Sequence, residues 1–203
     1  MSNIQLYGGR MGSSLRCHWA FAEVGVEYEN LHVNMREGEH KKEPFLKLNP
    51  NGQVPVLLDG DFVLSESIAI NDYIAEKYKP ELAGTTPEEK ALVLQWSLWS
   101  GFNLQRYFNQ LIGFRWTGVK DERVIEEGRK GLERFMPVLD QALNGVQFLV
   151  GNRFTLADIN VCAVLTYNDQ GDFDMASYPH VQQWMQAMYA RPAFVQAKEG
   201  EKK

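Results

Sequence analysis

The sequence predicts two domains of different fold class, a small mixed α/β domain followed by an all-helical one. Up to residue 79, short alternating apolar runs typical of strands are interleaved with apolar residues at helical spacing. Beyond residue 86 only the helical spacing recurs. The stretch 80–86 contains a proline and a glycine and shows neither period, so we interpret it as a linker between domains at 1–79 and 87–203.

Composition and charge argue against several functional classes. The chain has 203 residues, 44% of them hydrophobic, and a net charge of −5, whereas a nucleic-acid partner would require a basic patch. Two cysteines without a C-x-x-C pair and four histidines without zinc spacing predict neither a disulfide framework nor a metal site. No apolar leader and no apolar run of ~18 residues is present, so we expect a cytoplasmic protein without membrane contact.

The first domain is predicted from the order of its elements. The patterns indicate, in chain order, a strand at 4–7, a helix from about 15 to 25, a strand at 31–35, a loop at 36–42, a hairpin at 54–64 and a helix at 68–78. A helix between the first two strands implies a parallel crossover. The expected result is a small mixed sheet of the thioredoxin-like kind.

The second domain shows clear helix start and stop signals. Thr86 followed by Pro87 and Glu89, and Thr155 followed by Asp158, are both capping-box patterns that begin helices. A long helical pattern at 121–143 contains Pro137, which is expected to bend it or divide it. A last main helix is expected between residues 178 and 191.

The most informative segment is Asn49-Pro50-Asn51-Gly52-Gln53-Val54-Pro55, with Glu66-Ser67 a short way downstream. An X-Pro bond adopts the cis form at low cost, and a cis turn would aim the backbone N–H and C=O of Val54 outward. Glu66-Ser67 opens a helical pattern, and a helix start offers free N–H groups to an anion. The two features together suit a short, acidic, peptide-like ligand.

These segments resemble those of the cytosolic glutathione transferases, with phi-like and bacterial serine-type classes the most similar. The resemblance covers nearly the whole chain and rests on an ordered set of motifs: Leu6-Tyr7-Gly8, 23–29, 38–41, 49–55, Asp59-Gly60, Glu66-Ser67 and 154–159. It implies the glutathione transferase fold, glutathione as co-substrate without a metal, and a homodimer.

The resemblance also implies which residues bind glutathione. Val54, before Pro55, would pair its backbone with the cysteinyl part of the tripeptide. Gln53, Glu66 and Ser67 would hold the γ-glutamyl end, with the Ser67 hydroxyl and N–H on the carboxylate. His40 and Lys41 lie in the loop where the family contacts the glycyl carboxylate, and a lysine there supplies a point charge.

Catalysis requires the glutathione thiolate, and a free thiol has a pKa of about 8.5. In the family a serine or tyrosine near the first helix donates a hydrogen bond to the sulfur. Ser13 is the first candidate, Ser14 the second, and Tyr7 a rival in the preceding strand. The phi pattern places its serine five residues before the helix arginine, whereas Ser13 precedes Arg16 by three, so the loop is shorter here.

The resemblance places the electrophile on the helical domain, where an aromatic-rich region would form an apolar wall. The candidate residues are Tyr107, Phe108, Leu111 and Arg115. Aromatic residues at helical spacing also fill cores, so both interpretations stay open. We expect a transferase that joins the thiolate to hydrophobic electrophiles, with peroxide reduction as a further activity. The alternatives are a non-catalytic interaction or regulatory protein on the same fold, or a glutathione-dependent lyase or reductase.

Overall fold

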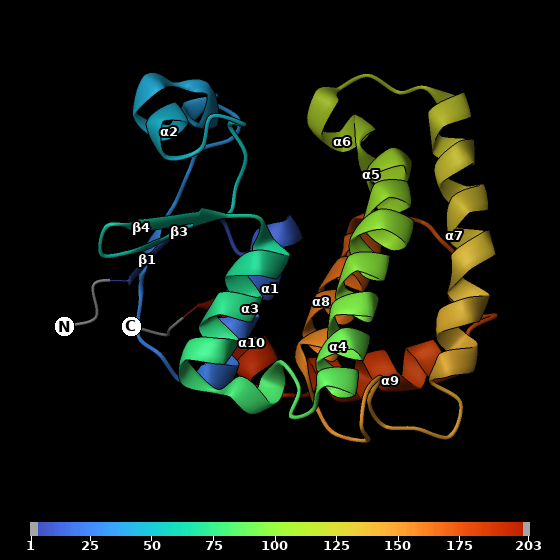
Figure 1. Cartoon of the computed structure of the whole chain (residues 1–203). Coiled ribbons are helices and arrows are strands. Elements are labelled where there is room, and N and C mark those ends of the chain that lie inside the picture. The colour runs from blue at the N-terminus through green and yellow to red at the C-terminus, as the bar shows by residue number, and fades with distance from the viewer. Residues whose placement is uncertain (1–3, 201–203) are drawn as a thin grey trace. The chain divides into compact units, whose positions relative to one another are not determined.

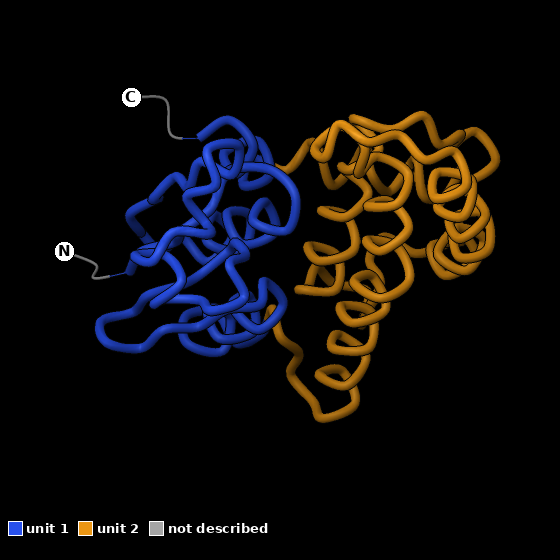
Figure 2. The backbone as a smooth tube through the Cα atoms, turned by 90° about the horizontal axis from the view of Figure 1, so that it is seen from above, with its two compact units in different colours: residues 1–81, 192–203 blue, residues 82–191 orange. Residues whose placement is uncertain are grey.

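The structure, a computed structural model, describes residues 4–200, which divide into two compact units (Figure 2). Unit 1 contains the chain up to Glu81 together with the residues from Pro192 onward, and unit 2 contains Leu82–Arg191. The boundary expected from the sequence left the final segment with the helical domain. The structure instead packs helix α10 (Pro192–Glu199) on helix α1 (Gly12–Val24), where the rings of Phe194 and Trp19 meet edge-on with centroids 4.8 Å apart.

Unit 1 is built on a four-stranded mixed sheet in the order β2-β1-β3-β4. Figure 1 labels β1, β3 and β4 of this sheet. β1 pairs in parallel with β2 and antiparallel with β3, and β3 pairs antiparallel with β4. Helices α1 and α3 pack together and bury an apolar cluster against the sheet. The strands and the remaining helix are β1 (Ile4–Tyr7), β2 (Glu29–Leu31), β3 (Val56–Asp59), β4 (Phe62–Ser65) and α3 (Ser67–Tyr78). This arrangement confirms the predicted thioredoxin-like domain with its parallel crossover.

The segment between β2 and β3 differs from the sequence-based expectation. The second strand covers Glu29–Leu31 rather than 31–35, and the loop expected at 36–42 contains a 3-10 turn at Glu39–Lys41 followed by α2 (Glu43–Leu48). The alternation of apolar residues at 31–35, from which the strand was predicted, arises from packing. Val33 is buried with Phe45 and Val56 in a second apolar cluster, so it serves packing without taking part in a strand.

Unit 2 is all-helical, as predicted. Its α-helices are α4 (Pro87–Trp99), α5 (Arg106–Ile112), α6 (Phe114–Thr117), α7 (Glu122–Ala142), α8 (Leu156–Leu165) and α9 (Pro179–Tyr189). A π-helical stretch, Ser100–Gln105, joins α4 to α5, and Pro137 lies inside an undivided α7. Within residues 4–200, none of the helices combines the length and the apolar character needed to cross a membrane.

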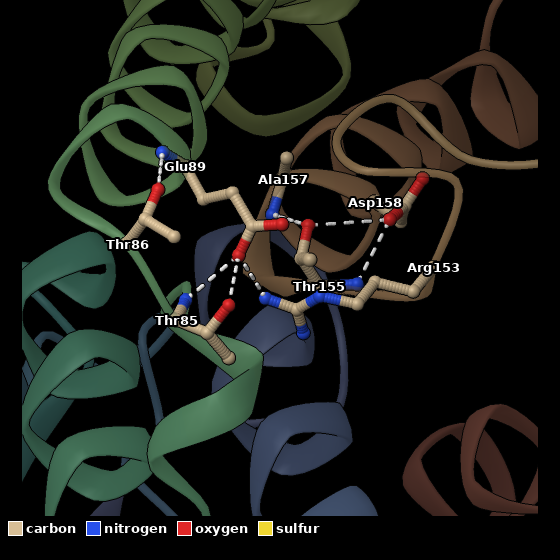
Figure 3. Close-up of polar contacts among 7 residues, drawn as sticks. All are labelled: Thr85, Thr86, Glu89, Arg153, Thr155, Ala157 and Asp158. Carbon is tan, nitrogen blue, oxygen red and sulfur yellow. Dashed lines mark hydrogen bonds and ion pairs between the residues drawn. The ribbon is translucent and has the colours of Figure 1, made fainter.

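Threonine side chains cap the first turns of α4 and α8 (Figure 3). The Thr155 hydroxyl accepts from Ala157 N at 3.2 Å, and the Asp158 carboxylate accepts from Thr155 N at 2.9 Å, which confirms the capping box. Thr86 caps α4 by accepting from Glu89 N at 3.2 Å. The Glu89 carboxylate turns to Thr85 and to Arg153 instead of completing a box with Thr86, and Arg153 holds the pKa of Glu89 down at about 2.

Helices α5 and α7 are neighbours (Figure 1), and α7 carries glycine where the two helices meet. A Cβ on Gly131 would lie 2.1 Å from the Tyr107 ring, and one on Gly128 would lie 2.8 Å from the backbone of α5. The Tyr107 ring also stacks on Phe135 with centroids 5.9 Å apart. Much of the Tyr107 ring is therefore used for packing between helices.

Candidate functional site

The turn that precedes β3 is held by a buried asparagine. The Val54–Pro55 peptide bond is cis. Asn49, only 4% exposed, donates from Nδ2 to Gln53 O at 2.8 Å and accepts from Asn51 N at 3.1 Å. Sequence reasoning missed this positioning role, although asparagine before a turn of this kind is a recognised signal. Asn49 thus pairs with backbone groups of the turn from its inner side. The Gln53 side chain is exposed, and Val54 is partly exposed.

Lys41 is the last residue of the 3-10 turn Glu39–Lys41, and it links that segment to the proline turn before β3. Its ammonium donates to Gly52 O at 3.1 Å and to Asn51 O at 3.4 Å, so it is not a freely solvated charge. Gly52 adopts φ 58, and a Cβ there would lie 2.8 Å from His40 O. A lysine ammonium has three donor positions, so one is left for a ligand. Neighbouring His40 is partly buried, and its Nδ1 makes no hydrogen bond among the described residues.

Helix α3 begins beside this turn with an unusual backbone. Glu66, the residue before it, has φ 71 and ψ 110, a left-handed value uncommon outside glycine and one that costs about 1–3 kcal/mol. Its side chain does not cap the helix, and Ser67, 8% exposed, is the first helical residue. The first N–H groups of α3 are thus available to an anion.

The two serines at the start of α1 lie in different environments. Ser13 is partly exposed, and its hydroxyl donates to Val54 O at 3.3 Å. Ser14 is 2% exposed, and its Oγ lies so close to Gly8 that a Cβ there would be 2.5 Å away. Tyr7 packs edge-on against Phe45 with ring centroids 6.2 Å apart. Of these three, Ser13 is the one whose hydroxyl meets the carbonyl expected to bind the ligand.

The second turn of α1 lies against the start of α3. Cys17 Sγ lies 3.5 Å from Ser67 O, in a fully buried contact. Burial raises the pKa of the Cys17 thiol far above its usual range, so the thiolate does not form at neutral pH. Cys17 is therefore a packing residue.

The four residues predicted to contact the electrophile are not equally accessible. Phe108 and Leu111 are 0% and 2% exposed, and the Phe108 ring faces Tyr167 at 6.4 Å. Their burial favours a core role over that of lining a surface. Tyr107 is partly exposed and Arg115 is exposed, so these two stay predictions.

A thioredoxin-like unit with this proline turn, joined to an all-helical unit, has the architecture of a cytosolic glutathione transferase. Comparison with known families agrees. The model for the glutathione S-transferase N-terminal domain matches residues 2–76, and that for the C-terminal domain matches residues 97–192. The chain belongs to the glutathione S-transferase family.

Individual relatives are similar over almost the full chain. Glutathione S-transferase 1 of Zea mays is 33% identical over 95% of this chain and 94% of its own. The structure of a glutathione S-transferase I bound with lactoylglutathione is 32% identical, with a TM-score of 0.84 over 96% of this chain and 98% of its own. Glutathione transferase URE2P6 of Phanerochaete chrysosporium, solved with oxidized glutathione, is 28% identical, with a TM-score of 0.88 over 98% and 96%.

Proposed function

We propose that the protein catalyses the attack of the glutathione thiolate on hydrophobic electrophiles and that unit 1 binds the tripeptide. The carbon–sulfur bond forms as the electrophile loses its leaving group, and the proton of the thiol is released beforehand. The observation that carries the proposal is the contact between Ser13 Oγ and Val54 O at 3.3 Å. It brings a hydroxyl donor to the backbone position at which the cysteinyl part of glutathione is expected to pair.

The proposed binding mode uses three anchors in unit 1. The backbone of Val54 pairs with the cysteinyl residue, and the N–H groups at the start of α3, with the Ser67 hydroxyl, donate to the γ-glutamyl carboxylate. Gln53 and Glu66 complete the γ-glutamyl contacts, with Glu66 facing the ammonium. On binding, the Ser13 hydroxyl exchanges its long bond to Val54 for a charge-assisted bond to the sulfur, which favours the thiolate.

Two measurements test the proposal directly. Titration calorimetry with glutathione should register saturable binding, and the wild-type protein should release chloride from a chlorodinitrobenzene probe in the presence of glutathione. Binding without conjugation or peroxide reduction would favour a non-catalytic protein on the same fold. No binding at all would overturn the proposal.

Replacing Lys41 with alanine is expected to raise the KM for glutathione by about 10-fold with little change in kcat. The substitution removes a charge for the glycyl carboxylate and also releases Asn51 and Gly52, which the ammonium holds through their carbonyls. Steady-state kinetics over a range of glutathione concentrations would measure it. The adjacent and exposed Lys42 is the matched control, and equal KM values for Lys41→Ala and Lys42→Ala would contradict the assigned role.

We also propose a homodimer, as is typical of the family. Three apolar residues at helical spacing follow one side of α4 and the π-helical stretch after it, with Leu94 52%, Leu98 41% and Phe102 71% exposed. Such a contiguous apolar stripe is characteristic of an interaction surface. Sedimentation equilibrium should give a mass of two chains, and a Phe102→Lys variant should sediment as one chain.

A further inference from the structure

The loop between β1 and α1, which leads directly to Ser13, is tied to the last helix of unit 1. Arg10 Nη1 donates to Ala197 O at 2.9 Å and to Gln196 O at 3.3 Å. These carbonyls belong to the last turn of α10, where helix geometry leaves backbone oxygens short of intrahelical donors and favours a cation. One side chain thus links the approach to the proposed catalytic serine with a helix that lies far away in the sequence.

The end of α10 is shaped to accept this guanidinium. Gly200 has φ 84 and donates to Gln196 O at 2.9 Å, which turns the chain away from the helix axis. A Cβ on Gly200 would lie 3.2 Å from Arg10 Nε, so glycine leaves the room that the side chain requires. The Phe194 ring, packed edge-on against Trp19, fixes α10 on α1. Arg10 is therefore attached to an anchored element.

The inner side of the loop rests on a buried histidine. His18 is 1% exposed, pairs through Nδ1 with Tyr28 Oη at 2.7 Å, and faces the backbone of Gly8 and Gly9. Burial, with a further contribution from the charge of Arg10, lowers the pKa of His18 to about 4. The imidazole is thus neutral at physiological pH and does not repel the guanidinium. On its other side, the loop is held by the bonds from Arg10 to the carbonyls of α10.

We propose that Arg10 is a positioning residue for thiolate formation: its bond to the end of α10 fixes the loop and thereby places the Ser13 hydroxyl. Only Met11 and Gly12 separate Arg10 from Ser13, and Met11 has an extended backbone without a side-chain cap to hold it. Misplacement of a reacting group by 1 Å costs ~100-fold in rate. The helix end that binds Arg10 lies beyond residue 192, where the match to the family's C-terminal model stops. The inference rests on the proposed function.

The test compares Arg10→Met, which keeps the length of the side chain without its charge, with Arg10→Lys. In conjugation assays with glutathione and chlorodinitrobenzene, Arg10→Met is expected to lower kcat/KM by about 10-fold near pH 6.5 and to raise the apparent pKa of the bound thiol by about one unit. The calorimetric Kd for glutathione, measured at a pH well below the pKa of the bound thiol, should stay unchanged, which also shows that the variant is folded. Arg10→Lys, which keeps a cation for the same carbonyls, should recover most of the activity. Arg123→Met, at an exposed arginine of unit 2, is the matched control.

A double-mutant cycle with Ser13→Ala separates this inference from the proposed function. If Arg10 acts through Ser13, Arg10→Met should change kcat/KM by less than about twofold in the Ser13→Ala background. An unchanged pH profile in Arg10→Met, or an equal loss in both backgrounds, would overturn the role of Arg10 and leave the proposed function intact. Absence of glutathione binding by the wild-type protein would overturn both.

Discussion

Replacing Ser13 with alanine is expected to lower kcat/KM for glutathione conjugation by about 100-fold near pH 6.5, because the thiolate loses its hydroxyl donor. The same loss should raise the apparent pKa of the bound thiol by about two units, since each unit corresponds to about 1.36 kcal/mol. Wild-type and variant rates should therefore converge as the pH rises above the thiol pKa of the variant. A pH–rate profile measured at saturating glutathione would show both effects.

Ser14→Ala and Tyr7→Phe are the informative comparisons for this prediction. Ser14 is buried against Gly8 and the Tyr7 ring packs on Phe45, whereas the Ser13 hydroxyl donates to Val54 O. Both variants should retain most of the activity. A large loss in Ser14→Ala or Tyr7→Phe, with Ser13→Ala active, would transfer the donor role to the other residue.

Replacing Asp158 with alanine is expected to destabilise the protein by about 2–4 kcal/mol at pH 7, measured by denaturant unfolding. The carboxylate accepts from Thr155 N at 2.9 Å and from Leu149 N at 3.0 Å (Figure 3 shows the first contact), and Asp158 is 0% exposed. Its removal leaves two backbone donors unpaired, at about 1–3 kcal/mol each, partly offset by relief from burying a charge. Glu133→Ala, at an exposed position of α7, should have little effect.

The destabilisation should depend on pH in a defined direction. Burial raises the pKa of Asp158 from 3.8 to about 6, so the folded chain binds this proton more tightly than the unfolded chain. The contribution of the carboxyl to stability is therefore full below pH 3.8 and is lost as the pH rises through about 6. The effect of Asp158→Ala should be about 1 kcal/mol larger at pH 5 than at pH 7. A smaller effect at pH 5 would contradict this direction of the shift.

Short-range signals predicted most of the fold. The hairpin turn at Asp59-Gly60, the Thr155–Asp158 box and the helix that starts at Ser67 all depend on residues within a few positions of one another. Val33 shows where such signals fail, because an apolar residue packed beneath α2 and one within a strand give the same alternation. Membership of α10 in unit 1 depends on the distant contact between Phe194 and Trp19, for which the sequence carries no local signal.

The candidate site was predictable to the extent that it follows a motif. The segment 49–55 and Glu66-Ser67 were identified from the sequence, and the structure shows the cis bond at Pro55 and the left-handed Glu66. The contact of Asn49 with Gln53 O is local and carries a turn signal that the sequence reasoning missed. The bond from Arg10 to Ala197 O was not predictable, because it joins residues far apart in the sequence and nothing in the sequence distinguishes Arg10 from any other arginine.

The chain order of the two units has a consequence for biosynthesis. Helix α10 follows the whole of unit 2 in the sequence, yet it covers α1, near the beginning of the chain. On the ribosome, the uninterrupted segment 82–191 emerges in full before α10 does, so the α/β unit receives its last helix only after the helical unit has been synthesised. The nascent protein is thus expected to complete its helical unit before its α/β unit.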